Sequence, residues 1–494
     1  MLRSLRIVAA CALIAGSCTT TAPAPGDGAA ADTLDRVTVE GIRGHLEALQ
    51  RIATDHGGTR AVGTPGYEAS VEYVAEVLRE AGYEVTTRAI GMPVFSQVGP
   101  STLERISPSP TTWVDGRDLR AMIYSASGEV RGRLTPVGLD PPRDAGGAPV
   151  VSGPDGCSSG DFTGFLVGDV ALLRPGECLR REQILNAQGA GAVAVLVAYP
   201  LAATGRPVRP TLLYPDGIQI PVLAVTDEVG RDLLSNSRGR PLVLVRVEAS
   251  SSLAEVESVL GHTPSGDEGR VVVLGAHLDS VMDGPGIDDN GSGVATLLEV
   301  ARWLAGREAA AEVCFAFWAG EEEGTYGSRA YVDGLTSEER DAIVAYLNMD
   351  MIGSPNFGRF VYADRPQDPS AAAQSEAIQT MFTRSFEARG LSVEPLDLQG
   401  GADHGPFADG GIPVGGVFSG AFETKTARQA EAFGGAAGVP FDACYHQPCD
   451  TAANVSDTAL RQFAAALVAV LAELTGVEVD QLEVSAGPSR SSAS

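Results

Sequence analysis

The chain has 494 residues, 44% of them hydrophobic and 20% charged, and its formal net charge is −27 at pH 7. This length exceeds what one hydrophobic core usually fills, so we expect two domains, or one large domain that carries an insertion. An acidic surface repels phosphate backbones and anionic lipid, which argues against a nucleic-acid-binding function.

Residues 1–17 have the pattern of a signal peptide, with two arginines, the apolar run 7–14 and the small residues 15–17. The run is too short for a permanent transmembrane helix, so we expect an exported mature chain without one. Cys18 follows the small residues as in a bacterial lipobox, although Ala15 stands where Leu is usual. A lipoprotein of the periplasm or cell surface and a secreted protein both remain open. Residues 18–32 are predicted to be a flexible tether.

Export implies an oxidising compartment, in which exposed cysteines pair. We predict the disulfides Cys444–Cys449 and Cys157–Cys178. Cys314 lies inside the apolar run 313–318 and is predicted to be a buried free thiol. The cysteine spacing offers no cluster with histidines that would hold a metal.

The first domain segment, residues 33–114, begins as an α/β domain. Apolar residues recur at helical spacing over 38–54, and Thr64-Pro65 begins a second helix that stops at Gly82. Residues 83–90 alternate between apolar and polar as a strand does.

The block 115–248 has short predicted strands, much Gly and Pro, one predicted helix over 181–188, and no histidine. Its segments 168–178, 186–192 and 220–222 resemble a protease-associated (PA) domain. In relatives such domains sit over a peptidase site as a lid or substrate filter. Because the block carries no His or carboxylate cluster, we expect the chemistry to lie elsewhere.

Alternation of strands and helices returns in residues 249–478, and residues 479–494 are predicted to be a disordered tail. The apolar run 271–274 is too short for a helix and is predicted to be a buried strand. Further strands are predicted at 313–318, 343–347 and 412–418, and helices at 294–304, at 376–389 and between Ser456 and Gly476. Strand ends of an open α/β sheet meet at one edge, where ligands bind. Candidate ligands follow three of these strands: His277 after the first, Glu321 and Glu322 after the second, and Asp350 after the third. Asp288 and His446 come from loops.

Two imidazoles and three carboxylates, one of which can bridge, form the ligand set that a pair of zinc ions prefers. Such a bridge holds two cations about 3.5 to 4 Å apart, as two-metal hydrolases require. The doubled Glu321-Glu322 leaves one carboxylate free to act as general base. Taken alone, a His after a strand or an Asp-Asp-Asn-Gly run is usually a turn feature.

Five ordered motifs resemble the signatures of the MH-clan di-zinc aminopeptidases, in particular the secreted bacterial leucine-type enzymes. They are Gly275-Ala-His-Leu-Asp-Ser280, Gly286-Ile-Asp-Asp-Asn-Gly-Ser-Gly293, Gly320-Glu-Glu-Glu-Gly324, Asn348-Met-Asp-Met351 and Cys444-Tyr-His446. The resemblance implies a three-layer α/β/α sandwich with a central, mostly parallel mixed sheet, into which the small β-rich PA domain is inserted. It also implies two Zn²⁺ per chain.

Residue roles follow from the same resemblance. His277 and Asp350 would hold one zinc, Glu322 and His446 the other, and Asp288 would bridge them. Glu321 would be the base and Tyr445 the hydroxyl donor to the oxyanion. Asp279 would orient His277, and Asp403 and His404 would stand behind the ligands. A cis peptide bond is expected after the bridging residue, between Asp288 and Asp289.

The sequence thus predicts a metallo-aminopeptidase that removes N-terminal residues from peptides. Relatives have an Arg where this chain has Gly401, so the sequence does not tell which side chain the enzyme prefers at the first residue of its substrate. The alternatives are a glutaminyl cyclase-like or carboxypeptidase-like zinc enzyme on the same fold, and a metal-free binding protein. Cyclases use one zinc and lack the full ligand set, which argues against them.

Overall fold

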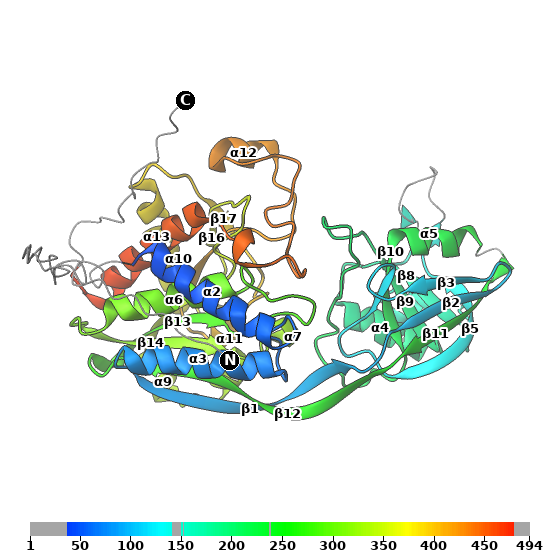
Figure 1. The fold of residues 1–494 in the computed structure, drawn as a ribbon, viewed down its shortest axis with the longest axis horizontal. Helices are drawn as coiled ribbons and strands as arrows, with labels where there is room; N and C mark the ends of the chain where they lie inside the picture. The colour runs from blue at the N-terminus through cyan, green and yellow to red at the C-terminus, as the bar shows by residue number, and fades with distance from the viewer. Residues whose placement is uncertain (1–36, 141–149, 152, 237–238, 479–494) are drawn as a thin grey trace, which may run out of the picture.

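The computed structural model describes residues 37–140, 150–151, 153–236 and 239–478. The predicted signal peptide, the tether with Cys18 and the C-terminal tail lie outside these ranges. The chain forms a larger and a smaller domain, which a long two-stranded ribbon connects (Figure 1). This arrangement is one large domain that carries an insertion.

The larger domain is built on an eight-stranded sheet. Its strand order is β1 (Glu84–Gln97), β12 (Ala249–His262), β14 (Ala311–Trp318), β13 (Asp267–His277), β15 (Ile343–Met349), β18 (Val414–Phe418), β16 (Phe360–Tyr362) and β17 (Glu394–Leu396). The four central strands, β14, β13, β15 and β18, pair in parallel. β12 and β16 flank them with antiparallel pairings. The sheet is therefore mixed and mostly parallel at its centre, as predicted.

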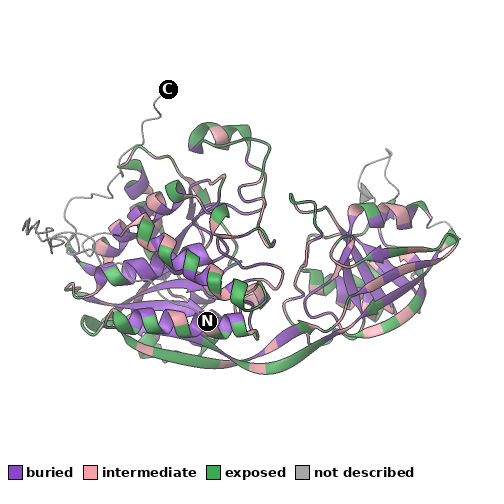
Figure 2. Cartoon of the chain, viewed as in Figure 1, coloured by how far each residue is buried: buried purple, intermediate pink, exposed green. Residues whose placement is uncertain are grey.

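Helices cover both faces of this sheet, because its central strands are apolar on both sides. Along β14, Phe315 and Phe317 enter the core below one helix layer, and Cys314 and Trp318 enter a separate core on the other face. The helices are α2 (Val39–Asp55), α3 (Pro65–Glu80), α6 (Gly291–Leu304), α7 (Glu321–Gly324), α8 (Tyr326–Asp333), α9 (Ser337–Ala342), α10 (Pro369–Glu387), α11 (His404–Asp409), α12 (Ala427–Phe433) and α13 (Asp457–Thr475), with a 3₁₀ turn η3 (Ala452–Asn454). Figure 2 shows the buried sheet between helices whose outer faces are exposed. The three-layer α/β/α prediction is confirmed.

The helix ends follow the capping signals of the sequence. Thr64 accepts a hydrogen bond from the Tyr67 amide, and Pro65 occupies the first helical position of α3. Ser456 caps α13, which ends at Gly476 with a left-handed φ of 73°. Among the described residues, only α13 is long and apolar enough to cross a membrane. Its apolar residues, such as Phe463 and Leu467, are buried in the core of the larger domain, so we interpret it as a core helix.

The ribbon shifts one predicted domain boundary. β1 and β12 pair without interruption from Glu84 opposite His262 to Gln97 opposite Ala249. The strands β2 (Thr102–Ser107) and β3 (Thr111–Val114) then belong to the sheet of the smaller domain. The predicted boundary at residue 114 is therefore too late, and the chain enters the smaller domain just after Gln97. Short strands carry no local sign of the sheet they join, because β2 is placed by pairing with β11, more than a hundred residues away.

The smaller domain also contains an eight-stranded sheet. Its order is β3, β2, β11 (Leu242–Val247), β5 (Gly128–Pro136), β8 (Val170–Leu173), β9 (Ala194–Tyr199), β10 (Val222–Thr226) and β4 (Leu119–Ala121), with a small separate pair of β6 (Leu139–Asp140) and β7 (Val150–Val151). Its helical elements are η1 (Ser159–Phe162), α4 (Arg180–Gly189) and α5 (Asp227–Ser235). The sequence predicts α4, whereas it gives no clear sign of α5, which Thr226 caps.

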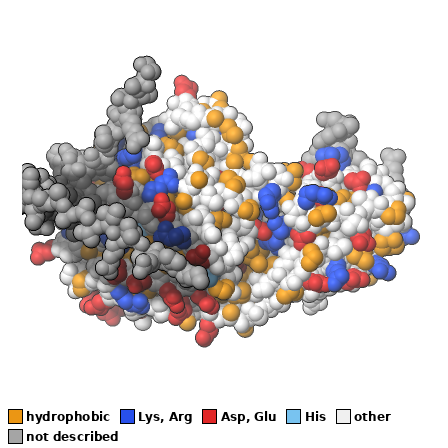
Figure 3. All heavy atoms as spheres, viewed as in Figure 1, with side chains coloured by type: hydrophobic (Ala, Val, Ile, Leu, Met, Phe, Trp, Pro, Cys, Tyr) orange, Lys and Arg blue, Asp and Glu red, His pale blue; other side chains and the backbone are white. Residues whose placement is uncertain are grey.

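Both predicted disulfides are present, Cys157–Cys178 in the smaller domain and Cys444–Cys449 in the larger one. Cys314 is a buried free thiol, as expected. On the face drawn in Figure 3, acidic side chains gather along the lower edge of the larger domain. This distribution is consistent with the net charge of −27.

Candidate metal centre

The carboxyl ends of three neighbouring parallel strands carry the candidate ligands. His277 is the last residue of β13, Glu322 lies in α7 after β14 beside the candidate base Glu321, and Asp350 directly follows β15. His446 comes from the loop between Cys444 and Cys449. Because these strands run in the same direction, their ends meet at one edge of the sheet.

Two groups of donor atoms converge at this edge, and Asp289 belongs to both. His277 Nε2 lies 3.2 Å from Asp289 Oδ1 and 3.5 Å from Asp350 Oδ1. His446 Nε2 lies 3.1 Å from Asp289 Oδ2 and 3.1 Å from Glu322 Oε2. Each imidazole thus has one carboxylate of its own and shares Asp289 with the other.

The shared carboxylate is Asp289, and the prediction of Asp288 is wrong. Asp288 is buried, belongs to neither donor group, and accepts a hydrogen bond from the Ser354 hydroxyl at 3.0 Å. Two adjacent residues in a turn point their side chains in different directions, and Asp450 sets this turn by accepting bonds from the Asp288 and Asp289 amides at 2.7 and 3.1 Å. The cis peptide bond also lies one residue later than predicted, between Asp289 and Asn290.

Asp279 contacts both His277 and the segment that carries the two glutamates. Its backbone carbonyl is 3.1 Å from His277 Nδ1, whereas its carboxylate is 3.9 Å away. The carboxylate instead accepts hydrogen bonds from the amides of Gly320, Glu321 and Glu322, at 2.9, 3.3 and 3.2 Å. Asp279 therefore positions a histidine through its backbone and the start of α7 through its side chain.

Glu321 and Tyr445 line a cleft of about 920 Å³ between the two domains, together with Glu322 and His446. Burial, followed by the nearby carboxylates of Asp350, Asp403 and Glu322, raises the pKa of Glu321. The Tyr445 ring stacks on the His446 ring with centroids 3.8 Å apart. Burial and the surrounding carboxylates raise the pKa of Tyr445, so its hydroxyl keeps its proton and remains a hydrogen-bond donor.

The His446 loop is constrained on several sides. The Cys444–Cys449 disulfide closes it, and the Gln447 side chain accepts a hydrogen bond from Thr204 of the smaller domain at 3.1 Å. His446 itself has a φ of 57°, in the left-handed region that non-glycine residues seldom adopt. The surroundings of His446 thus hold its imidazole in one place.

Asp403 and His404 have different surroundings. Asp403 accepts a hydrogen bond from the Ser328 hydroxyl at 2.5 Å, and burial raises its pKa to about 7. His404 is fully buried with Nε2 at 3.0 Å from Asp364, and its ring packs on Tyr362. Asp403 therefore lies near Glu321, whose pKa its carboxylate helps to raise, whereas His404 belongs to a separate buried pair.

Three supporting residues escape prediction from the sequence. The fully buried Arg60 donates hydrogen bonds to the carbonyls of Leu278, Pro285 and Gly286, and so holds the segment between His277 and Asp289. Asn290 accepts bonds from the Gly293 and Met351 amides, which ties the start of α6 to the end of β15. The third is Asp450, which sets the turn at the two aspartates. Arg60 and Asp450 contact segments that are distant along the chain, and the motif that contains Asn290 does not indicate its contact with Met351.

The donor set fits divalent cations. His277 and His446 are surrounded by Asp289, Asp350 and Glu322, and these carboxylates raise the pKa of both imidazoles although burial opposes protonation. Glu322 Oε1 is buried without a hydrogen-bond partner in the described part of the chain. Excess negative charge and an unpartnered carboxylate oxygen are what a bound cation would satisfy. Mixed imidazole and carboxylate donors suit zinc.

An α/β/α sandwich with paired imidazole and carboxylate groups at its strand ends defines a metallohydrolase class. Comparison with known proteins gives the family. Residues 258–471 match peptidase family M28, and residues 146–233 match the PA domain. An aminopeptidase of Pseudomonas aeruginosa is 37% identical over 419 residues, 84% of this chain and 77% of that protein.

Two further comparisons support the same assignment. A probable lipoprotein aminopeptidase of Mycobacterium tuberculosis, LpqL, is 37% identical over 86% of this chain and 83% of its own. The structure of a zinc aminopeptidase from Bacillus subtilis superposes with a TM-score of 0.66 at 22% identity, over 89% of this chain and 96% of that one. The chain belongs to the aminopeptidases of peptidase family M28 and carries a PA domain. The predicted family and enzyme class are confirmed.

Proposed function

We propose that this protein is an exported aminopeptidase that uses two zinc ions. His277 and Asp350 would hold one ion, and Glu322 and His446 the other. Asp289 would contact both. The observation that carries the proposal is the placement of Asp289, whose two oxygens lie 3.2 and 3.1 Å from the two imidazoles.

Bound zinc supplies Lewis acidity for the scissile carbonyl and lowers the pKa of water at the site. Glu321 would accept the proton of the attacking water on its carboxylate and later donate it to the leaving amine. Nearby cations would favour its ionised form, against the burial and carboxylates that raise its pKa without them. The protonated Tyr445 hydroxyl would donate a hydrogen bond to the developing oxyanion.

Carboxylates of the larger domain on the cleft support action at a free N-terminus. Glu321, Glu322 and Asp442 all border it. A carboxylate favours a protonated α-amine and gives nothing to an acylated one. We therefore expect residues to be removed one at a time from the amino end of a peptide.

Export is proposed from residues 1–17, and Cys18 is proposed as a lipid anchor. The M. tuberculosis relative bears the name of a lipoprotein, which supports the anchor. Metabolic labelling with a palmitate analogue, with a Cys18→Ser variant as control, would test it. Labelling that is equal in the two proteins contradicts the anchor.

The decisive experiment compares amino-acid anilides with free and acetylated N-termini as substrates of the zinc-loaded protein. We expect hydrolysis of the free form and none of the acetylated form, with two zinc ions per chain by atomic emission. Cleavage of both forms would contradict an aminopeptidase, and one zinc per chain would contradict the paired site.

A further inference from the structure

The cleft that borders the candidate metal centre has a second wall, contributed by the smaller domain. That wall includes Leu179, Leu201 and Tyr214, and Phe422 of the larger domain also lines the cleft. We propose that this wall binds apolar side chains at the second and third residues of the peptide substrate. The inference rests on the proposed aminopeptidase function and adds a specificity that the metal ligands do not set.

The wall is apolar and accessible to solvent. Leu179 is 56% exposed, Leu201 45%, Tyr214 38% and Phe422 64%. Ten large hydrophobic side chains are exposed among the described residues, and these four share one cleft. Exposed apolar side chains that gather in a concave site, rather than scattering singly, are typical of ligand-binding surfaces.

The position of the metal centre decides which part of the substrate meets this wall. Glu321, Glu322 and His446 border the cleft from the larger domain. An aminopeptidase leaves a single residue on the amino side of the bond that it cleaves. The remainder of a cleft of about 920 Å³ is therefore available to residues that follow that bond.

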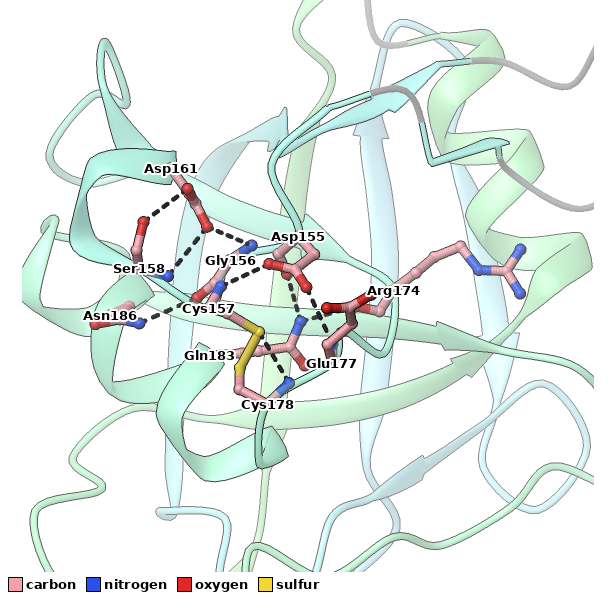
Figure 4. The surroundings of a disulfide bond; sticks show 10 residues. All are labelled: Asp155, Gly156, Cys157, Ser158, Asp161, Arg174, Glu177, Cys178, Gln183 and Asn186. Carbon is pink, nitrogen blue, oxygen red and sulfur yellow. Dashed lines mark hydrogen bonds between the residues drawn. A yellow bond between two sulfur atoms is a disulfide. The ribbon is translucent and has the colours of Figure 1, made fainter.

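The wall is held rigidly before substrate arrives. Leu179 follows Cys178 directly, and the Cys157–Cys178 disulfide joins this segment to the preceding loop (Figure 4). Asp155 accepts hydrogen bonds from the Cys157 and Glu177 amides, both at 3.0 Å. Gln183 of α4 donates to the carbonyls of Asp155 and Arg174. A preorganised apolar surface loses less conformational entropy when it binds a side chain.

Leu201 and Tyr214 lie on the loop between β9 and β10, which is fastened to the larger domain. Arg209 lies 2.7 Å from Asp283, both of them mostly buried. The Tyr214 ring packs edge-on against the Tyr326 ring, with centroids 5.7 Å apart, and the Tyr326 hydroxyl donates to the Leu213 carbonyl at 3.3 Å. These contacts join the loop to the larger domain, so that Leu201 and Tyr214 line the same cleft as Glu321 and His446.

Basic side chains on the same cleft suggest a competing prediction, a preference for acidic residues. Arg180 and Arg329 line it as well, and a substrate with acidic residues in the second and third positions would contact them. The two kinds of substrate therefore distinguish an apolar wall from a basic one.

The test measures kcat/KM on three tripeptides and one anilide. All share the first residue that gives the fastest anilide hydrolysis, and the tripeptides continue with Phe-Phe, Gly-Gly or Glu-Glu. We expect the Phe-Phe peptide to exceed the Gly-Gly peptide by at least about tenfold, because a single well-placed apolar group already contributes roughly that factor. Equal rates, or a preference for Glu-Glu, would overturn the proposal.

Variants locate the effect. Leu179→Ser and Leu201→Ser should lower kcat/KM on the Phe-Phe peptide by about three- to tenfold. They should leave the Gly-Gly peptide unchanged, because it has no side chains to contact the wall. Leu166→Ser is the matched control, since Leu166 is 51% exposed in the smaller domain and does not line the cleft. A loss equal to that of the control would refute the wall. Absence of anilide hydrolysis in the unaltered protein would instead refute the aminopeptidase proposal itself.

Discussion

The two domains of this protein resemble each other in sheet geometry and differ in the residues at the carboxyl ends of their strands. Each has an eight-stranded sheet with four consecutive parallel strands, β14-β13-β15-β18 in the larger domain and β5-β8-β9-β10 in the smaller. In the larger domain three strands end at or shortly before His277, Glu321 and Asp350, whereas β8 and β9 of the smaller domain lead into Arg174-Pro175 and Pro200. A parallel sheet thus offers a convergent edge, and only the residues placed there make it a candidate metal site.

The largest effect is expected at Glu321. Glu321→Gln removes the proton acceptor and keeps its size, so we expect turnover to fall by about 10² to 10⁴ while zinc stays bound. Glu323→Gln is the control, because Glu323 is buried and does not line the cleft. Anilide kinetics together with zinc content measure both effects, and an unchanged rate in Glu321→Gln would reject its assignment as base.

Asp288 and Asp289 test whether a single side chain at the strand ends of the larger domain decides metal binding. Asp289→Asn should lower the zinc content below two ions and reduce turnover by more than about tenfold, because an amide is a weaker metal ligand than a carboxylate. Asp288 belongs to neither donor group and accepts a hydrogen bond from the Ser354 hydroxyl, which the amide oxygen of Asn can also accept. Asp288→Asn should therefore retain both ions. The reverse outcome would restore Asp288 as the bridge.

Arg60 tests how far the larger domain depends on its buried polar frame. Arg60→Met leaves three carbonyls without their donor, so we expect the free energy of unfolding to fall by roughly 3 kcal/mol. Arg43→Met is the control, since Arg43 also donates to two carbonyls but its side chain is 26% exposed, and water can replace it. Urea unfolding of the two variants gives the comparison, and similar losses would contradict the role of burial.

The two disulfides give the most direct contrast between the domains. Replacing Cys444 and Cys449 with Ala frees the loop of Tyr445 and His446, so we expect anilide turnover to fall by about tenfold. Replacing Cys157 and Cys178 should destabilise the smaller domain by about 3 kcal/mol, because the disulfide closes a loop between cysteines that are 21 positions apart. Anilide turnover should stay unchanged. Equal losses of turnover would show that the domains do not divide these tasks.

Local chemistry made several features predictable. Thr64-Pro65 and Ser456 mark helix starts because caps act within one turn, and the run from Val313 to Trp318 indicates a strand because it is apolar on both faces. Other features depend on distant partners. β2 could not be assigned to a domain until its pairing with β11 was known. α5 is short and lies among strands of similar apolar content, which hides it.

The amino-acid sequence by itself determined the class of chemistry, since imidazoles and carboxylates recur in ordered motifs at strand ends and their donor types suit zinc. Only the tertiary structure decided which aspartate stands between the imidazoles, because Asp288 and Asp289 are chemically identical and the carboxylate of Asp450, from the far end of the chain, orients the turn that separates them. It likewise placed the loop between β9 and β10 in the lining of the cleft. Arg209 and Thr204 of this loop contact Asp283 and Gln447, which are too distant in the sequence for a local pattern to indicate the contact.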